Sequence, residues 1–197
     1  MPRFLPGPLA SRKKANRAAH DFAALLGRVI NTTVSSAPLK FVEVEGVEEF
    51  TGYVAHCGAN NIPVPMQLED GSYFFVRHRL GLRRKERYLT TLEYSYRLQR
   101  TFDPTSWIFR YEYIREPKAP FPYPNCHIHV NARPPSYGGA KPFNRLHLPA
   151  GERVTIEDVV RHIVVEHGIG PISPRWEQQL SETETSFREI QRLRLRL

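Results

Sequence analysis

The chain contains little cysteine and no long apolar segment. Cys57 and Cys126 are its two cysteines, too few for a disulfide framework and too far apart for the Cys-x-x-Cys pairs of a structural zinc site. The sequence lacks the charged start and apolar run of a signal peptide, and no run approaches the roughly 20 apolar residues of a membrane span. We therefore expect a soluble, cytoplasmic protein with no membrane partner.

Several familiar phosphate-handling motifs are also missing. The sequence has no Gly-rich phosphate loop and no internal repeat. Histidine-triad nucleotide hydrolases need a third His where Asn131 stands, and two-His phosphoesterases need two His-x-Thr/Ser motifs. His127-Ile128-His129 satisfies neither pattern. A function must therefore be argued from a constellation of side chains.

Positive charge exceeds negative charge. The 197 residues carry 28 Lys and Arg against 20 Asp and Glu, a formal net charge of +8. Apolar residues make up 41% and charged residues 24%, as in ordinary globular domains. A basic protein favours an anionic partner, with nucleic acid the commonest kind and an acidic protein the next. Solubility from excess positive charge is the alternative reason for such a composition.

Apolar spacing and turn residues predict both helices and strands. Thr155 with Asp158 is close to a helix capping box, and Asp70-Gly71 between apolar runs is typical of a tight hairpin turn. Alternating residues predict an aromatic hairpin over 88–115 and a strand over 126–132. Further strands are expected at 39–45, 66–68, 73–76 and 145–149, and helices at 11–30, 155–167 and 174–191.

Together these elements predict an α+β fold. We expect an antiparallel sheet of about five or six strands with three helices packed on one side. The expected organisation is an irregular arm at 1–10, a single α+β domain at 11–191 and a fraying basic tail at 192–197. A Pro-rich connector at 117–124 and a flexible loop at 136–139 flank the strand 126–132.

The stretch Asn125–Arg133 is the most informative. As a strand it places Cys126, Ile128, Val130 and Ala132 on one face, and His127, His129, Asn131 and Arg133 on the other. A face made of imidazoles, an amide and a guanidinium is unusual for a strand that only fills a core.

If this strand lies beside the hairpin 88–115, one sheet face gathers a reactive set of side chains. Sequential strands are usually neighbours, and the non-aromatic faces would then bring together Glu93, Arg97, Arg110, Glu112, His127, His129 and Asn131, with His147 from the next extended segment. This set can cleave a phosphodiester without metal. A His or Glu takes the 2′-hydroxyl proton, a second His protonates the leaving oxygen, and Arg stabilises the charge on phosphorus.

Two alternatives remain open for this polar face. His127 and His129 can both reach one metal ion, with His147 or Glu112 as a third ligand, although Arg97 and Arg110 would oppose a cation. A purely structural polar face is the other alternative. Imidazoles buried against backbone carbonyls would exclude the enzymatic interpretation. Our prediction assigns no metal and no cofactor, with His127, His129, Arg110, Arg97, Glu112 and His147 as the catalytic set.

Two basic segments are candidates for binding nucleic acid. The first is the early part of the helix 11–30, and the second is a basic run that Gly81 interrupts, which predicts a hairpin tip or loop. Both are either solvated surface or phosphate-binding surface. Their candidate residues are Arg12, Lys13, Lys14, Arg17, Arg77, Arg79, Arg83, Arg84, Lys85 and Arg87.

The order of these elements resembles a known family. An aromatic strand pair containing Phe109-Arg110-Tyr111, a Pro-rich connector, the His strand and a capped helix resemble the TumE-type toxins of bacterial toxin–antitoxin operons. Longer bacterial proteins with a segment like Leu146-His147-Leu148-Pro149 are also similar. The resemblance covers about 88–168 and implies a ribonuclease-toxin type of α+β fold and an antitoxin partner. The long N-terminal half and the last helix depart from the toxins.

These observations lead to two functional hypotheses. The first is a toxin or defence-type protein that acts on nucleic acid, RNA rather than DNA, by metal-independent cleavage with His general acid/base chemistry. The second is a non-enzymatic module that binds nucleic acid or an acidic protein through the basic surface. An enzyme needs two proton-transferring groups in one cleft, whereas a binding module needs only a continuous positive face.

Overall fold

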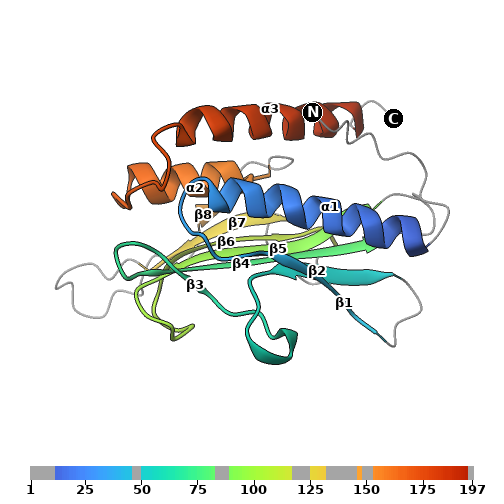
Figure 1. The fold of residues 1–197 in the computed structure, drawn as a ribbon, viewed down its shortest axis with the longest axis horizontal. Coiled ribbons are helices and arrows are strands. Elements are labelled where there is room, and N and C mark those ends of the chain that lie inside the picture. The colour runs from blue at the N-terminus through green and yellow to red at the C-terminus, as the bar shows by residue number, and fades with distance from the viewer. Residues whose placement is uncertain are drawn as a thin grey trace.

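A computed structural model shows a single antiparallel sheet with helices on one side (Figure 1). It describes residues 12–45, 50–82, 89–116, 125–131, 146–147 and 153–194, with the backbone alone at 146–147 and 186–194. In this part of the chain the sheet has eight strands in the order β1-β2-β4-β5-β6-β7-β8, with β3 paired to β4. Their bounds are Lys40–Glu43, Thr51–Ala55, Met66–Gln67, Tyr73–Leu82, Leu89–Gln99, Trp107–Ile114, Cys126–Val130 and Leu146–His147 for β1 to β8.

The predicted fold class is confirmed. Every pairing among the described strands is antiparallel. Two of the eight strands, β3 and β8, have two residues each, so six longer strands match the expected five or six. The predicted aromatic hairpin forms β5 and β6, and β7 pairs with β6, as expected for sequential strands.

The helices form two layers above one face of the sheet. They are α1 (Arg12–Asn31), α2 (Ile156–Val165) and α3 (Trp176–Arg194). Helices α1 and α2 pack on the sheet, and α3 packs on α2 and α1 as an outer layer (Figure 1). The Tyr111 hydroxyl lies 3.0 Å from Nδ1 of His162, which joins β6 to α2.

The ends of the last two helices follow from local chemistry. Thr155 caps α2 through the predicted capping box, because its side chain accepts the N–H of Asp158 while the Asp158 carboxylate accepts the N–H of Thr155. Gly168, at φ +68, follows the end of this helix. Ser173 accepts the N–H of Arg175 in a turn, so α3 begins two residues later than predicted. No helix in the described ranges has the length and apolarity to cross a bilayer.

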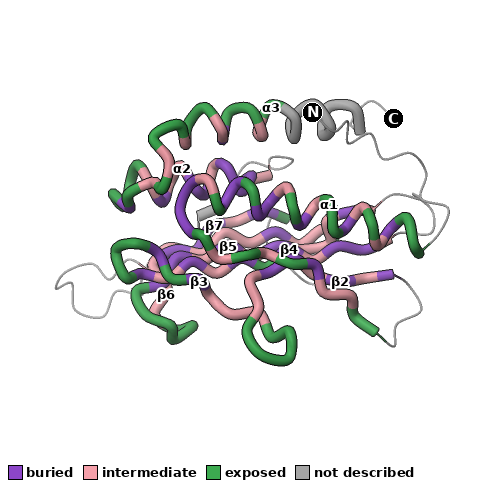
Figure 2. The backbone as a smooth tube through the Cα atoms, in the orientation of Figure 1, coloured by how far each residue is buried: buried purple, intermediate pink, exposed green. Residues whose placement is uncertain are grey.

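The core lies between the sheet and the helices α1 and α2. Alternating strand residues such as Phe74, Tyr96 and Phe109 are almost fully buried there, together with Ile30 and Ile163 of the helices (Figure 2). The intervening strand residues point to the opposite side, which we call the helix-free face. No helix of the described residues lies on this face, and it carries charged side chains such as Arg77, Arg79 and Glu93.

One prediction about the basic run was wrong. Arg77 and Arg79 belong to the ten-residue strand β4 and not to a loop. Gly81 does not break the strand; it lies so close to Leu92 that a Cβ there would be 2.7 Å from that side chain. The strand continues because its alternate residues Val76, His78 and Leu80 are buried in the core.

Other predictions lie outside the described residues. These are the arm 1–10, the first residue of the helix expected at 11–30, the connector 117–124, the loop 136–139 and the basic residues Arg83, Arg84, Lys85 and Arg87. Helix α3 extends to Arg194, into the segment expected to fray.

Candidate functional site

The helix-free face aligns the predicted polar residues in rows across neighbouring strands. In one row Ser95 of β5 is opposite Glu112 of β6, which is opposite His127 of β7. In the next row Arg97 is opposite Arg110, which is opposite His129. The two rows lie side by side because residues two apart on a strand share a face.

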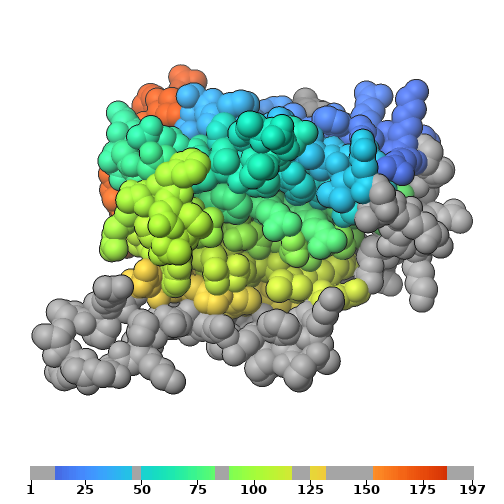
Figure 3. Space-filling model, turned by 90° about the horizontal axis from the view of Figure 1, so that it is seen from below, coloured from blue at the N-terminus to red at the C-terminus, as the bar shows by residue number. Residues whose placement is uncertain are grey.

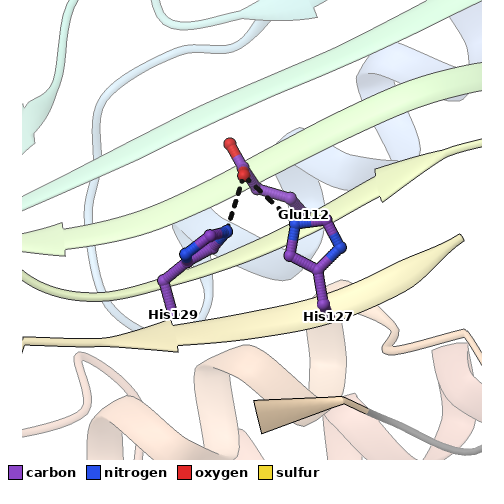
Figure 4. Close-up of side chains that lie close together, drawn as sticks. All are labelled: Glu112, His127 and His129. Atoms are coloured by element: carbon purple, nitrogen blue, oxygen red, sulfur yellow. Dashed lines mark ion pairs between the residues drawn. The ribbon is translucent and has the colours of Figure 1, made fainter. Parts of the chain in front are cut away.

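Glu112, His127 and His129 converge on one point (Figure 4). Nε2 of His129 lies 3.1 Å from Oε2 of Glu112, and Nε2 of His127 lies 3.5 Å from the same oxygen. The two imidazole rings are 4.8 Å apart between centroids, in an edge-to-face arrangement. The sequence pattern therefore predicts these three residues correctly as one cluster.

The cluster is covered on the imidazole side and open on the carboxylate side. The His127 and His129 side chains are 12% and 7% exposed, whereas that of Glu112 is 27% exposed. Both imidazoles pair with a carboxylate. Glu112 is thus the member of the cluster whose side chain is most exposed to solvent.

The charges around Glu112 keep its carboxylate ionised. Burial by itself raises the pKa of Glu112, but the hydrogen bond with His127 and the charges of Arg110, His129 and His127 outweigh it, so the pKa lies below its ordinary value. Nε of Arg110 is 3.2 Å from Oε1 of Glu112. The cluster thus places a carboxylate between a guanidinium and two imidazoles.

Two guanidinium groups border the cluster. Burial and the nearby charge of Arg110 lower the pKa of Arg97, against the effect of Glu112. The Arg97 guanidinium lies 4.6 Å from the ring centre of Phe75, and that of Arg110 lies 5.6 Å from the ring centre of Trp107. The stacked rings hold both guanidinium groups in place, where they can meet an anion.

His147 lies beside the cluster in backbone register. It belongs to β8, where it pairs with His127. The structure therefore brings the predicted sixth residue to the strand next to the site, and its side chain lies outside what the structure describes.

The three converging residues also match the geometry of a metal site. One ligand atom from each lies within 4.8 Å of the other two. Two ligands at about 2.1 Å from a zinc ion and at tetrahedral angles are about 3.4 Å apart, close to the Glu112–imidazole distances. Arg110 engages the other oxygen of Glu112 and opposes a cation there. The side chains of Glu112, His127 and His129 can thus either share a proton or bind a metal ion.

The described parts of the two predicted basic segments lie on opposite sides of the sheet. Arg12, Lys13, Lys14 and Arg17 lie exposed on α1, above the helix-covered side of the sheet, and Arg12 pairs with Glu43. Arg77 and Arg79 lie on the helix-free face, where each is within 3.7 Å of a carboxylate oxygen of Glu93. The remaining four basic candidates lie outside the described residues.

Two residues lie on a different side from the one that their sequence context predicts. His78 stands within the basic run, but it is buried in the core with Nδ1 2.9 Å from the Tyr96 hydroxyl. Alternation places Trp107 on the aromatic core face, but an irregularity after Leu98 shifts the register, and its ring lies beside His129 and Arg110. A register shift of this kind leaves no signal in the alternation of apolar residues.

Comparison of the chain with family models, with curated proteins and with solved structures returned no match. The resemblance to TumE-type toxins therefore stays a prediction. The function has to be argued from the geometry of the site.

Proposed function

We propose that this protein cleaves RNA by metal-independent general acid/base catalysis at Glu112, His127 and His129. The observation that carries the proposal is the convergence of both imidazoles on one oxygen of Glu112, at 3.1 and 3.5 Å. Arg97 and Arg110 on the adjacent row supply positive charge at the same place. A base, an acid and a charge-stabilising group within one cluster are the requirements of phosphodiester transfer.

In the proposed reaction Glu112 is the base. Its carboxylate takes the proton of a ribose 2′-hydroxyl, and the 2′-oxygen attacks the adjacent phosphorus. The bond from phosphorus to the 5′-oxygen breaks as His127, in its imidazolium form, gives its proton to that oxygen. The products are a 2′,3′-cyclic phosphate and a free 5′-hydroxyl. The lowered pKa of Glu112 keeps its carboxylate ionised before the reaction begins.

The other residues of the site have supporting roles in the proposal. His129, the more buried imidazole, holds the shared oxygen of Glu112 in position. Arg97 and Arg110 bind the phosphate and stabilise the negative charge that develops on it. His147 is a further proton-transfer candidate by its register beside His127.

A metal-assisted hydrolase is the second candidate, because the three ligand atoms also lie at metal-like separations. The two candidates differ in one simple property. Cleavage that persists in EDTA supports the acid/base proposal, whereas cleavage that stops in EDTA and returns with Zn²⁺ or Mn²⁺ supports the metal.

A non-enzymatic binding module is the alternative from another class. It is favoured by the exposed arginines of the helix-free face and needs no proton transfer. As a toxin, in contrast, the protein would arrest growth when produced alone and would require a neutralising protein partner. Growth and RNA integrity therefore separate the two.

The test is induction of the wild type and of a His127→Ala/His129→Ala variant in bacteria, with growth followed and total RNA examined. We expect arrest and RNA fragmentation with the wild type and neither with the variant. Arg175→Gln, an exposed change before α3, is the matched control and should behave as wild type. Normal growth and intact RNA with the wild type would refute the enzymatic proposal.

Cleavage assays with purified variants test which residues take part in the reaction. Glu112→Gln keeps the shape of the side chain and removes the base, so we expect cleavage of an RNA oligonucleotide to fall by about 10²- to 10⁴-fold. Circular dichroism and a melting curve establish that the variant is folded. A folded Glu112→Gln protein with wild-type cleavage would remove Glu112 from the mechanism.

A further inference from the structure

On or beside the helix-free face, three aromatic rings each lie close to the guanidinium group of an arginine. The Arg77 guanidinium lies 5.9 Å from the ring centre of Tyr53, and that of Arg97 lies 4.6 Å from the ring centre of Phe75. The Trp107 ring is paired in the same way with Arg110. Each pair offers a flat ring together with a positive charge.

These pairs follow a line across the strands that ends at the catalytic cluster. Tyr53 is on β2, Phe75 on β4 and Trp107 on β6. Strands β2, β4, β5 and β6 are consecutive neighbours in the sheet, so the line crosses about 14 Å of sheet at about 4.8 Å per strand. It also runs along the strands, because Tyr53 is opposite Arg79, four residues and about 13 Å beyond Phe75 on β4. The ring of Trp107 then lies 6.4 Å from that of His129. We call Tyr53, Phe75 and Trp107 with their arginines the aromatic track.

The track is accessible. Tyr53, Phe75 and Trp107 are partly exposed, and the Arg77 side chain is 45% exposed. Figure 3 shows this side of the sheet, with β2, β4, β5 and β6 crossing it in order. Rings of this size that stay partly exposed on a sheet without a helix above them are available for a ligand.

The chemistry of the track matches an unpaired nucleic acid strand. Aromatic rings and guanidinium planes stack on bases of any sequence, and arginines bind the phosphates between them. Stacking requires bases that are free of a duplex. Among the described residues no helix lies on this face that could insert into a groove of double-stranded nucleic acid.

We propose that the aromatic track binds single-stranded RNA and leads it to Glu112, His127 and His129. The inference rests on the proposed function for the choice of RNA over DNA, because the cleavage chemistry needs a 2′-hydroxyl. The stacking and the positive charge make no such distinction. In this arrangement bases stack on Tyr53 and Phe75 while the phosphate to be cleaved meets Arg97 and Arg110.

The experiment measures binding separately from cleavage. The full-length protein with Glu112→Gln is titrated into a fluorescein-labelled single-stranded RNA of about 12 nucleotides, within the known site sizes of such binders, and anisotropy is recorded at several salt concentrations. The same RNA annealed to its complement and a DNA strand of the same sequence are the comparison probes. We expect the duplex to bind more weakly than either single strand.

Two kinds of variant distinguish stacking from charge. Phe75→Leu and Tyr53→Leu keep apolar bulk but remove the flat ring, so each should weaken binding about fivefold to a hundredfold with the salt dependence unchanged. Arg77→Gln should instead lower the slope of log affinity against log salt by about 0.7. Arg175→Gln removes the same charge on the helix side, and it should leave affinity and slope nearly unchanged.

The outcomes separate this inference from the proposed function. Wild-type affinity in Phe75→Leu and Tyr53→Leu proteins that melt normally, or equal affinity for duplex and single strand, overturns the track. Equal losses with Arg77→Gln and Arg175→Gln would also overturn it, because net charge alone would then account for binding. If the track variants lose binding but no RNA is ever cleaved, the track stands and the proposed cleavage fails.

Discussion

Arg97 and Arg110 occupy directly opposite positions on β5 and β6, so two guanidinium groups lie side by side on the helix-free face. Like charges directly opposite each other destabilise a sheet. Burial and the charge of Arg110 both lower the pKa of Arg97. Such a pair is retained at a cost in stability, which an anion bound between the two groups would offset.

Phosphate should therefore stabilise the protein through this pair. At equal ionic strength, replacing chloride with phosphate should raise the melting temperature of the wild type by a few degrees more than that of Arg97→Gln. Phosphate also stabilises proteins generally by exclusion from their surface. Arg175→Gln corrects for that effect and should respond to phosphate as the wild type does. An equal shift in all three proteins would show that no anion binds between Arg97 and Arg110.

The ionised carboxylate of Glu112 should stabilise the folded protein in addition to its role in the site. Its folded-state pKa is lowered, so its stabilising contribution is present above its ordinary value and is lost as the pH falls below it. We expect Glu112→Gln to lower the free energy of unfolding by about 1–2 kcal/mol at pH 7. The difference from wild type should shrink as the pH is lowered toward 3, measured by urea unfolding. A difference that is constant with pH would indicate that the charge of Glu112 is not what stabilises the fold.

Because His78 is buried, we expect the folded protein to lose stability in mild acid. Burial, with a smaller effect of Arg153, lowers its pKa from 6.5 to about 3. Between these values the unfolded chain binds a proton that the folded chain does not, so stability falls as the pH drops below 6.5, by up to about 1.4 kcal/mol per pH unit. The ring faces the Tyr96 hydroxyl, Thr91 Oγ1 at 2.8 Å and a cavity of about 30 Å³ that Glu157 also lines.

Replacing His78 tests this prediction by comparison. His78→Gln should be less stable than wild type at pH 7.5, by about 1–3 kcal/mol, because the new side chain fills the site less well. Its free energy of unfolding should nevertheless depend less on pH between 6.5 and 4.5. Parallel pH profiles of the two proteins would mean that His78 is not the group that takes up the proton on unfolding.

Replacing each of two glycines with alanine should change the stability of the protein in opposite directions. A Cβ at Gly52 in β2 would overlap the ring of Phe41 and the carbonyl oxygen of Val42, whereas one at Gly27 in α1 has Leu39 at 3.8 Å as its nearest neighbour. Gly52→Ala should therefore destabilise the protein by about 2 kcal/mol or more. Gly27→Ala should stabilise it by up to about 1 kcal/mol. Urea unfolding of both variants checks the pair, and a tolerated Gly52→Ala would show that β1 and β2 can separate.

The alternation of residues along the strands is sufficient to predict the cluster. Alternate residues of a strand share a face, so Glu112 faces the same way as Arg110 on β6, and His127 the same way as His129 on β7. The pairing of β6 with β7 then brings Glu112 and the two histidines together. The same alternation predicts which aromatic residues enter the core, including Tyr96 and Phe109. Local pattern and neighbouring strands therefore account for this part of the prediction.

The errors arise where packing or register overrides local composition. The charges of Arg77 and Arg79 suggest a loop, yet the alternate residues Val76, His78 and Leu80 are buried, and β4 extends through Leu82. The position of Trp107 depends on a shift of register in β5, which only the pairing with β6 defines. The arrangement of α3 above the other helices depends on contacts far apart in the chain.

From Phe109 to Tyr113, successive side chains of β6 alternate between the two faces of the sheet. Phe109, Tyr111 and Tyr113 point toward the helices while Arg110 and Glu112 point away from them. Inserting or deleting one residue near the start of β6 would exchange these two sets, sending charges into the core and rings to the surface. Evolution can therefore vary the chemistry of the site by substitution, one side chain at a time. A change of one residue between Phe109 and Tyr113 would therefore disrupt the core and the site together.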